Sequence, residues 1–392
     1  MNRTQWLQET RRMRFEEAYF GWSERRFTQE EAARLLGVHA RTFRRYIDRY
    51  KEEGLDGLLD KRISRISHRK APADEVIDLQ KLYGECYAGW NVKHFYSFYR
   101  RHHEGRRSYT WVKNKLQEGG LAKKAPGRGK HRKQRARAPL IGMMIHQDGS
   151  THEWVPGRYW DLIVTMDDAT SEHYSMFFVE EEGTASSFKG VKDVIEGHGL
   201  FCSLYTDRAS HYWHTPVAGG KVDKANFTQF GRAMHQLGIE MIPAYSPEAR
   251  GRSERAFKTH QGRLPKELAA AGIIDIKRAN QYLKETYQPA FNDEFQIKPA
   301  EPGTGFVPLI GQDVTDILCE HYERTVGKDN CVSFEGMKLQ IPADQYRRHY
   351  IKVKVRVHRY TEGNLAIFHG PRKLADYGNT GKLMEKGKQK VA

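Results

Sequence analysis

The sequence predicts a multidomain protein with helical modules at the N-terminus, an α/β core in the centre and a small β domain at the C-terminus. Three observations support this architecture. The chain has 392 residues, enough for two to four domains. Apolar residues recur at helical spacing before about residue 120, whereas apolar runs of strand length begin at residue 141. Strict alternation of apolar and basic residues over 350–360 then indicates a β unit.

Charge divides the chain at the same place. Residues 1–140 hold 33 Lys and Arg against 17 Asp and Glu, whereas residues 141–392 hold 32 of each. The whole net charge of +16 therefore lies in the first third. A basic N-terminal part joined to a neutral one indicates that the front binds a polyanion and that the rest has another task.

Composition also excludes several classes of protein. No apolar run reaches transmembrane length, and the charged N-terminus lacks the apolar segment of a secretory signal, so we expect a cytoplasmic protein. The four cysteines are far apart and form no Cys-x-x-Cys pair. We therefore expect free, buried thiols in a reducing compartment and neither a disulfide framework nor a zinc knuckle.

The first helical module, residues 1–62, carries a helix-turn-helix pattern over 28–50. Thr28 and Glu31 form a capping box that starts a helix, and Gly37 allows the left-handed residue of a tight inter-helix turn. Apolar residues on both sides of the turn follow helical spacing, which is typical of DNA-binding helix-turn-helix motifs. An ordinary helical hairpin with a basic face is the alternative. The DNA-facing candidates are His39, Arg41, Thr42 and Arg45.

A second helical module, over 74–121, is predicted on weaker grounds. Asn91 can cap one helix, and Ser108 can cap another that ends at Gly119 and Gly120. The second of these helices is either a DNA-reading helix or part of a plain three-helix core. Its DNA-facing candidates are Tyr109, Thr110, Lys113 and Asn114.

A basic linker, residues 122–140, follows the helical modules. Residues 123–137 contain eight Lys and Arg and no acidic residue, so this segment repels itself and stays extended. It is either a solvated linker or a segment that tracks phosphates, and the candidates for phosphate contact are Lys130, Arg132 and Lys133.

Three carboxylates stand out in the predicted core, residues 141–300. Asp148 and Asp207 each end an apolar strand, and Glu254 lies early in a long polar helix. Carboxylates at strand ends emerge where open α/β sheets bind ligands. Three of them together would repel one another unless cations such as Mg²⁺ were bound, and two Mg²⁺ ions can promote phosphoryl transfer.

Other acids compete with this assignment. Asp167 and Asp168 also follow a predicted strand, and we interpret them as turn or supporting residues. Glu248 is the rival of Glu254, but it directly follows Ser246-Pro247 and is therefore expected at the end of a loop.

The segments around the three acids resemble the acidic motifs of DDE transposases and retroviral-type integrases. They read D-G-S from Asp148, Y-T-D-R-A-S-H around Asp207, and Y-S-P-E-A-R-G-R-S-E-R-A-F-K-T-H-Q around Glu254. The order of modules also resembles bacterial insertion-sequence transposases, particularly the ISNCY type. The resemblance covers nearly the whole chain. The chain departs from the pattern of the best-known integrases in two ways. It has 46 residues between Asp207 and Glu254, with a loop insertion near 211–226, and it lacks a His₂Cys₂ finger.

The resemblance implies an RNase H-like catalytic core. It implies that Asp148, Asp207 and Glu254 bind two Mg²⁺ ions, with Mn²⁺ as a substitute, and that Lys258 approaches the DNA end. The implied function is a DNA transposase that binds the terminal inverted repeats of its element, hydrolyses the phosphodiester at the 3′ end and joins the 3′-OH to target DNA. We expect at least a dimer on DNA. Further phosphate-binding candidates are Arg250, Arg252 and Arg255.

Two other functions remain open. One is a non-catalytic DNA-binding protein, such as a domesticated transposase, although its simplest sign would be loss of the three acids. The other is an RNase H-type nuclease acting on RNA–DNA hybrids, although helix-turn-helix modules favour duplex DNA.

The C-terminal part, residues 312–370, is predicted as a small, barrel-like β domain before a basic tail over 371–392. Residues 351, 353, 355 and 357 are apolar, whereas Lys352, Lys354, Arg356 and His358 alternate with them. The basic face is either a solvated strand face or, by the resemblance, a surface for DNA or a neighbouring protomer.

Overall fold

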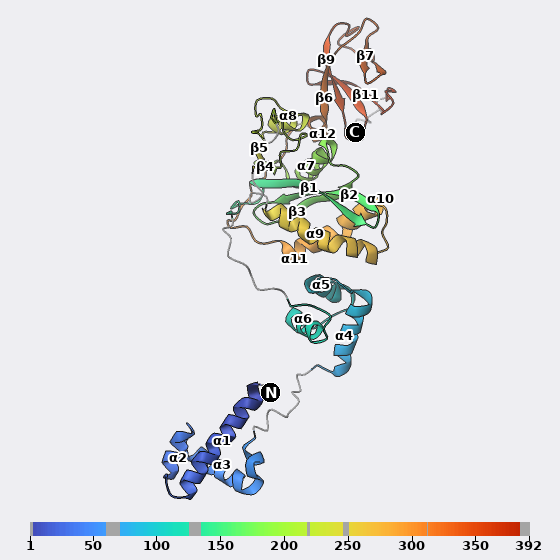
Figure 1. Cartoon of the computed structure of the whole chain (residues 1–392). Helices are drawn as coiled ribbons and strands as arrows, with labels where there is room; N and C mark the ends of the chain where they lie inside the picture. Colours follow the sequence, from blue (N-terminus) through green and yellow to red (C-terminus); the bar gives the residue numbers. More distant parts are fainter. Residues whose placement is uncertain are drawn as a thin grey trace, which may run out of the picture. The chain divides into compact units, whose positions relative to one another are not determined.

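The structure is a computed structural model that describes residues 3–59, 71–124, 135–217, 220–245, 251–311 and 313–384 (Figure 1). The candidates Lys130, Arg132, Lys133 and Arg250, and the rival acid Glu248, lie outside the described residues. The chain divides into two compact units. One comprises 1–86 and 110–122, and the other 87–109 and 123–392. Within the described residues, no helix is both long enough and apolar enough to cross a membrane.

The first unit is helical, as predicted. Its elements are α1 (Arg3–Ser23), α2 (Gln29–Leu35), α3 (Ala40–Glu53), the 3₁₀ turn η1 (Gly54–Leu58), α4 (Ala73–Cys86) and most of α6 (Tyr109–Glu118). The core of α1–α3 contains Phe15, Ala33, Phe43 and Ile47, which are all at most 3% exposed. Gly37 has φ +65°, so the chain turns between α2 and α3 where the sequence predicts it.

The capping box at the start of α2 is present. The Thr28 Oγ1 accepts from the Glu31 backbone N–H at 3.2 Å, and the Glu31 carboxylate accepts from the Thr28 N–H at 2.7 Å. These bonds also lower the pKa of Glu31. The box therefore fixes the entry into the helix-turn-helix.

Replacing Thr28 by Ala is expected to cost about 1 kcal/mol of local stability, because an α2 amide loses its acceptor. Hydrogen exchange read by mass spectrometry on the full chain should show α2 amides exchanging about fivefold faster. Thr10→Ala is the control, since the Thr10 hydroxyl bonds only the Trp6 carbonyl within α1. Equal exchange in α2 for both variants would contradict the role of the capping box.

The second unit contains a five-stranded mixed sheet. Its strands are β1 (Met144–Val155), β2 (Arg158–Asp167), β3 (His173–Val179), β4 (Ser203–Thr206) and β5 (Glu240–Pro243), in the order β3-β2-β1-β4-β5. Strands β1, β2 and β3 are antiparallel, whereas β4 runs parallel to β1 and β5 parallel to β4. This is the α/β core that the apolar runs predict.

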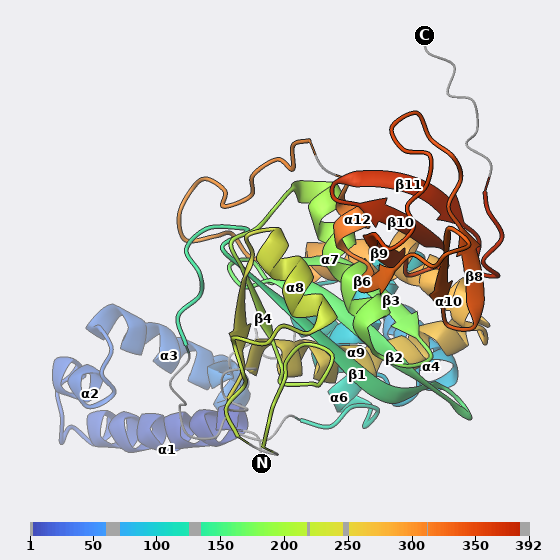
Figure 2. The same cartoon turned by 90° about the horizontal axis from the view of Figure 1, so that it is seen from above.

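Helices cover both faces of this sheet (Figures 1 and 2). On one face, α7 (Thr184–His198) and α8 (Gln229–Gln236) pack over Ile145 and Leu204. On the other, Trp154, Leu162 and Val164 pack against the remaining helices of the core. These are α9 (Gly251–Ala270), α10 (Ile276–Tyr282), the π-helical turn η3 (Leu283–Tyr287) and α11 (Gln288–Phe295).

Helix α5 (Val92–His102) packs with this second unit. Asn91 caps it, as predicted, by accepting from the Lys93 N–H at 2.8 Å. The buried His94 Nε2 lies 2.7 Å from the Glu267 carboxylate of α9, and the Ser97 hydroxyl donates to Glu294 of α11 at 2.7 Å. Since these contacts join α5 to α9 and α11, the segment just before α6 is attached to the core.

The C-terminal β unit is present, but in the described residues its strands do not close into a barrel. After the short helix α12 (Val314–Ile317), an antiparallel sheet forms in the order β11-β10-β9-β6, and β7 and β8 form a separate hairpin. The strands are β6 (Glu320–Thr325), β7 (Cys331–Phe334), β8 (Met337–Gln340), β9 (Lys354–Arg359), β10 (Leu365–His369) and β11 (Arg372–Tyr377).

Two expectations about side chains are wrong. The predicted alternation places His358 on a basic outer face, yet it is only 3% exposed. Strand β9 lies between β6 and β10, and the His358 ring stacks on Phe368 at 4.0 Å, so both of its faces are covered there. Among the four cysteines, which are all free, Cys86 and Cys202 are exposed and not buried.

Candidate active site

Asp148 lies inside a strand and not at its end. The sequence places it at the end of an apolar run, but β1 continues to Val155 because its antiparallel pairing with β2 continues past Asp148. On its other side, β1 pairs with β4 only from Met144 to His146. Asp148 is therefore at the point where pairing with β4 has ended, and its side chain is 6% exposed.

The register between β1 and β4 brings two of the three acids together. His146 is paired with Tyr205, and Asp148 and Asp207 each follow their strand's paired residue by two positions. Parallel strands lie about 4.8 Å apart, so the two carboxylates extend from neighbouring strands on one side of the sheet. Asp207 directly follows β4, as predicted, and its Oδ1 accepts from the Ala209 N–H at 2.9 Å.

A fourth acid, Glu182, lies beside this pair and was missed from the sequence. A Cβ placed on Gly149 would lie 2.1 Å from the Glu182 Oε2, so this carboxylate covers the residue next to Asp148. Burial raises the pKa of Tyr212 well above its usual value, and the charges of Glu182, Asp148 and Asp207 raise it further. Glu182 follows β3 by three residues, and only the fold brings it here.

Glu254 is on the first turn of α9, which packs against β1. The Gln261 amide of α9 donates to the Ser150 hydroxyl of β1 at 3.0 Å, which fixes the helix along the strand. Glu254 is exposed, and so are its neighbours Arg255 and Lys258. These side chains are thus on an accessible part of the helix that borders the acid-bearing strand.

The donor set suits a hard divalent cation. Asp148 and Asp207 offer carboxylate oxygens, which Mg²⁺ prefers, and Glu182 and Glu254 add two more on adjoining elements. Among the described residues, the three predicted ligands are not gathered within 4.8 Å of one another.

Asp168 is the centre of a buried ionic network next to these acids. It is 0% exposed, and its carboxylate accepts from Arg135 at 2.6 Å, from His146 Nε2 at 2.6 Å and from the Ala138 N–H at 2.7 Å. Arg252 of α9 pairs with the same carboxylate. Although burial raises the pKa of Asp168, the bonds from His146 and Ala138 and nearby positive charge lower it strongly overall.

This network connects the linker and the three acid-bearing elements. Arg135 and Ala138 belong to the predicted basic linker, and Arg252 stands two residues before Glu254. His146 stands two residues before Asp148, and its ring lies 5.0 Å from that of Tyr205, which stands two residues before Asp207. Asp168 therefore acts as a supporting residue. Arg252, a candidate for phosphate binding, is here paired with an acid.

Asp167 has a turn role. It ends β2, and its carboxylate accepts from the Gly142 N–H at 2.9 Å and from the Thr170 N–H at 2.8 Å. These bonds hold the β2–β3 turn against the start of β1.

Behind Glu254, α9 is held to the core by two buried histidines. His173 Nε2 lies 3.0 Å from His260 Nε2, and His260 Nδ1 lies 3.0 Å from the Tyr287 hydroxyl. Burial lowers the pKa of His173 to about 4 and that of His260 well below its usual value. Both rings are thus neutral at pH 7.

Acidification below about pH 6.5 is expected to destabilise the core. Unfolded histidine has a pKa near 6.5, so between about pH 6.5 and pH 4 the unfolded chain binds a proton that folded His173 does not. For His173 this loss is about 2 kcal/mol at pH 5. Urea unfolding at pH 7 and pH 5 should show that His173→Gln reduces the pH dependence by about that amount. The exposed His214→Gln is the control, and an equal pH dependence in both variants would contradict the assignment.

Most of the DNA-facing candidates of the first module are exposed. His39 caps α3 by accepting from the Arg41 N–H at 3.2 Å, and His39, Arg41 and Arg45 are exposed, whereas Thr42 is half-buried. Because α3 buries Phe43 and Ile47, the opposite face of the helix is free to face a groove.

The DNA-facing candidates of the second helical module differ in exposure. Thr110 and Asn114 are exposed on α6, whereas Tyr109 and Lys113 are half-buried. The Tyr109 ring lies 5.6 Å from that of Tyr96, in an edge-on contact that occupies one side of it.

Comparisons with known proteins match one part of the chain to a domain family and most of it to curated relatives. Residues 19–76 match the family model described as winged helix-turn helix. The chain is 29% identical over 349 residues to a putative transposase, y4bF, of Sinorhizobium fredii, covering 87% of this chain and 75% of that protein. It is 28% identical over 235 residues to the transposase for insertion sequence IS1202 of Streptococcus pneumoniae, covering 59% of this chain and 50% of that protein.

Among solved structures, the chain is similar to the simian T-cell lymphotropic virus intasome, with 13% identity, a TM-score of 0.34 and coverage of 78% of this chain and 97% of that one. It is also similar to the HTLV-2 integrase catalytic core domain in complex with magnesium, with 14% identity, a TM-score of 0.29 and coverage of 37% and 84%. These scores are too low to support an assignment by themselves. Both curated relatives are transposases and residues 19–76 match a helix-turn-helix family, so the chain is similar to insertion-sequence transposases over most of its length.

Proposed function

We propose that this protein is a DNA transposase that cuts the 3′ ends of its element and joins them to target DNA at an RNase H-like active site. The register between β1 and β4 carries the proposal, because it places Asp148 and Asp207 on neighbouring strands at the point where pairing ends. The packing of α9 along β1 supports adding Glu254 as the third acid. The transposase relatives favour this chemistry over a nuclease acting on hybrids.

Two steps would share this site. In the first, a water oxygen attacks the phosphorus at the element end, the bond from phosphorus to the 3′ oxygen breaks, and the 3′-OH is freed. In the second, that 3′ oxygen attacks a phosphodiester of target DNA and displaces another 3′ oxygen. Both are in-line phosphoryl transfers, so no intermediate bound covalently to the protein is needed.

Different residues of the chain would bind the metal ions and the DNA. Asp148, Asp207 and Glu254 would hold two Mg²⁺ ions, for which Mn²⁺ would substitute. When bound, such ions activate the attacking oxygen and neutralise charge on the leaving one. Arg255 directly follows Glu254 on α9, and Lys258 lies about one turn further along; both are exposed and would hold DNA phosphates near the acids. Glu182 is an additional carboxylate for orienting the attacking oxygen.

The basic N-terminal region would supply recognition of the element. Helix α3, with His39, Arg41, Thr42 and Arg45, would read terminal repeats in the major groove. Helix α6 and the basic linker would add contacts to bases and phosphates. Since two element ends must be joined, the protein would act on DNA at least as a dimer.

The experiment uses purified full-length protein and end-labelled DNA taken from just outside its own reading frame. With Mg²⁺ or Mn²⁺ we expect cleavage at one defined 3′ end, no cleavage in EDTA, and joined products when target DNA is added. An RNA–DNA hybrid of the same sequence is the matched control. Preferential cutting of the hybrid would overturn the proposal in favour of a nuclease. Specific DNA binding without cleavage under either metal would favour a non-catalytic DNA-binding protein.

A further inference from the structure

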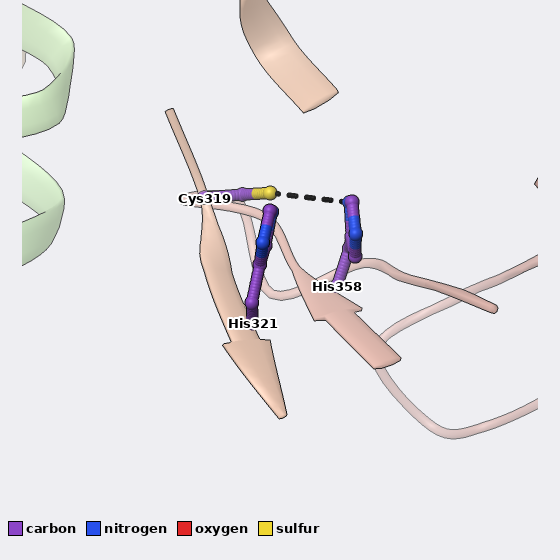
Figure 3. Close-up of side chains that lie close together, drawn as sticks. All are labelled: Cys319, His321 and His358. Carbon is purple, nitrogen blue, oxygen red and sulfur yellow. Dashed lines mark hydrogen bonds between the residues drawn. The ribbon is translucent and has the colours of Figure 1, made fainter. Parts of the chain in front are cut away.

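A cluster of two histidines and a cysteine lies in the C-terminal part, apart from the candidate active site. Cys319 directly precedes β6, His321 is on β6, and His358 is on β9. One ligand atom of each lies within 4.8 Å of those of the other two (Figure 3). The residues are far apart in sequence and come together because His321 and His358 are paired across the two strands.

The spacing between the thiol and one imidazole suits a tetrahedral ion. Cys319 Sγ lies 3.5 Å from His358 Nδ1. In a tetrahedral site with Zn–S near 2.3 Å and Zn–N near 2.0–2.1 Å, a sulfur and a nitrogen ligand are about 3.5 Å apart. One thiolate and two imidazoles form a donor set that selects zinc over magnesium or calcium.

The outer hydrogen bonds also have the form expected around metal ligands. His321 Nε2 lies 3.0 Å from the Asp316 carbonyl, so it carries the proton and leaves Nδ1 with a free lone pair. His358 is 3% exposed, and its Nε2 is buried without a hydrogen-bond partner in the described part of the chain. A buried polar atom left without a partner is costly, and ligation is one way to recover that cost.

We propose that Cys319, His321 and His358 form a structural zinc site, with a water as the fourth ligand, that joins the start of β6 to β9 within the C-terminal sheet. Zinc binding displaces the thiol proton of Cys319, which is released to solvent, and forms one Zn–S bond. The imidazoles bind as neutral ligands, so no oxidation or reduction takes place.

The protonation states of the two histidines suit zinc binding, whereas the cysteine must lose a proton. Burial and nearby positive charge lower the pKa of His321 to about 4 and that of His358 to about 2, so both imidazoles are neutral at pH 7. Burial raises the pKa of the Cys319 thiol to about 12 without metal, and the proton on that thiol must be displaced. Arg232, Arg356 and Lys373 oppose a further positive charge here, and the thiolate offsets one of those charges.

The proposed ligands lie where the C-terminal sheet contacts α8. In α8, Gln229 exchanges two hydrogen bonds of 2.9 Å with the backbone of His321, and Arg232 donates to the carbonyls of Ile317 and Cys319. In the structure the two imidazoles are stacked, with centroids 3.8 Å apart and planes at 18°. Binding one ion therefore requires a ring to turn until the nitrogen lone pairs converge. If His358 turns, it gives up its hydrogen bond with the Cys319 Sγ, whereas its Nε2 has no hydrogen bond to break in the described part of the chain.

The test is the metal content of untagged full-length protein, purified under reducing conditions and measured by inductively coupled plasma mass spectrometry. We expect about one zinc per chain in the wild type after equimolar zinc is supplied, and at least a tenfold lower content in Cys319→Ser and His358→Gln. Cys331→Ser, in the same β unit, is the matched control and should retain the metal. Asp207→Asn should also retain it, which separates this site from the candidate catalytic one.

Replacement by cobalt gives a second readout that needs no variant to fold. Cobalt(II) bound by a thiolate in tetrahedral geometry gives a thiolate-to-metal charge-transfer band, and we expect that band in the wild type. Chelation should lower the melting temperature of the wild type but not that of Cys319→Ser. Wild-type protein without stoichiometric zinc and without the cobalt band would overturn the proposal, and so would equal zinc content in Cys319→Ser. None of these readouts depends on transposase activity.

Discussion

Replacing Asp207 by Asn is expected to abolish strand cleavage and joining while leaving DNA binding unchanged. The amide keeps the shape of the side chain and its acceptor oxygen for the Ala209 N–H, but it loses the negative charge that a divalent cation needs. Stabilisation of transition-state charge by metal is worth several kcal/mol, and a loss of about 4 kcal/mol corresponds to about a thousandfold slower reaction. The readout is the rate of 3′-end cleavage of labelled element ends in Mg²⁺.

The matched control for this variant is Glu240→Gln on the neighbouring strand β5. Glu240 is an exposed acid on the same sheet, but it is at the start of its strand, at the opposite end of the β4–β5 pairing from Asp207. Its cleavage rate should stay within about twofold of the wild type. Both variants should shift labelled DNA equally in a binding assay. If Asp207→Asn cleaved DNA at a rate close to that of Glu240→Gln, Asp207 would not be an active-site residue.

Local patterns predicted the parts of the fold that depend on local residues. The capping box at Thr28, the turn at Gly37 and the cap at Asn91 are all found where the sequence places them, because each depends on residues within one helical turn. The strands β2, β3 and β4 follow apolar runs that are buried on both faces, so periodicity and length identify them.

Features that depend on partners distant in sequence were not predicted. The length of β1 was underestimated because its polar second half stays in the sheet through pairing with β2. His358 alternates with apolar residues like an exposed strand residue, but its neighbour β10 supplies Phe368 and β6 supplies His321. Glu182 follows β3 like an ordinary loop acid, and only the packing around Gly149 brings it to the other acids.

Asp168 shows the same limit at the site itself. The sequence marks it as a supporting acid, but its partners come from three places: the linker at Arg135 and Ala138, β1 at His146, and α9 at Arg252. No regular spacing in the sequence could have predicted that these residues come together. Once they are assembled, the carboxylate holds α9 against β1 near its first turn, where Glu254 is found, just as Gln261 and Ser150 hold it further along.

Asp168→Asn should therefore weaken both stability and catalysis. The neutral amide cannot balance the two guanidinium groups of Arg135 and Arg252 at a site that is 0% exposed. Breaking such a buried pair costs about 3 kcal/mol, which urea unfolding of the full chain can measure. Because His146, Tyr205 and Arg252 each stand two residues from a proposed metal ligand, we also expect about tenfold slower cleavage.

The control for Asp168→Asn is Asp193→Asn on α7, where a half-buried carboxylate accepts from Ser175 and Lys189. That variant should cost at most about 1 kcal/mol, since exposed ion pairs contribute little. The distinguishing readout is the ratio of cleavage rate to DNA affinity in folded protein well below the unfolding midpoint. If Asp168 only stabilised the fold, this ratio would equal that of Asp193→Asn. A reduced ratio with unchanged affinity is expected of a residue that positions the acids, because the Asp168 carboxylate bonds the strand and the helix that carry two of them.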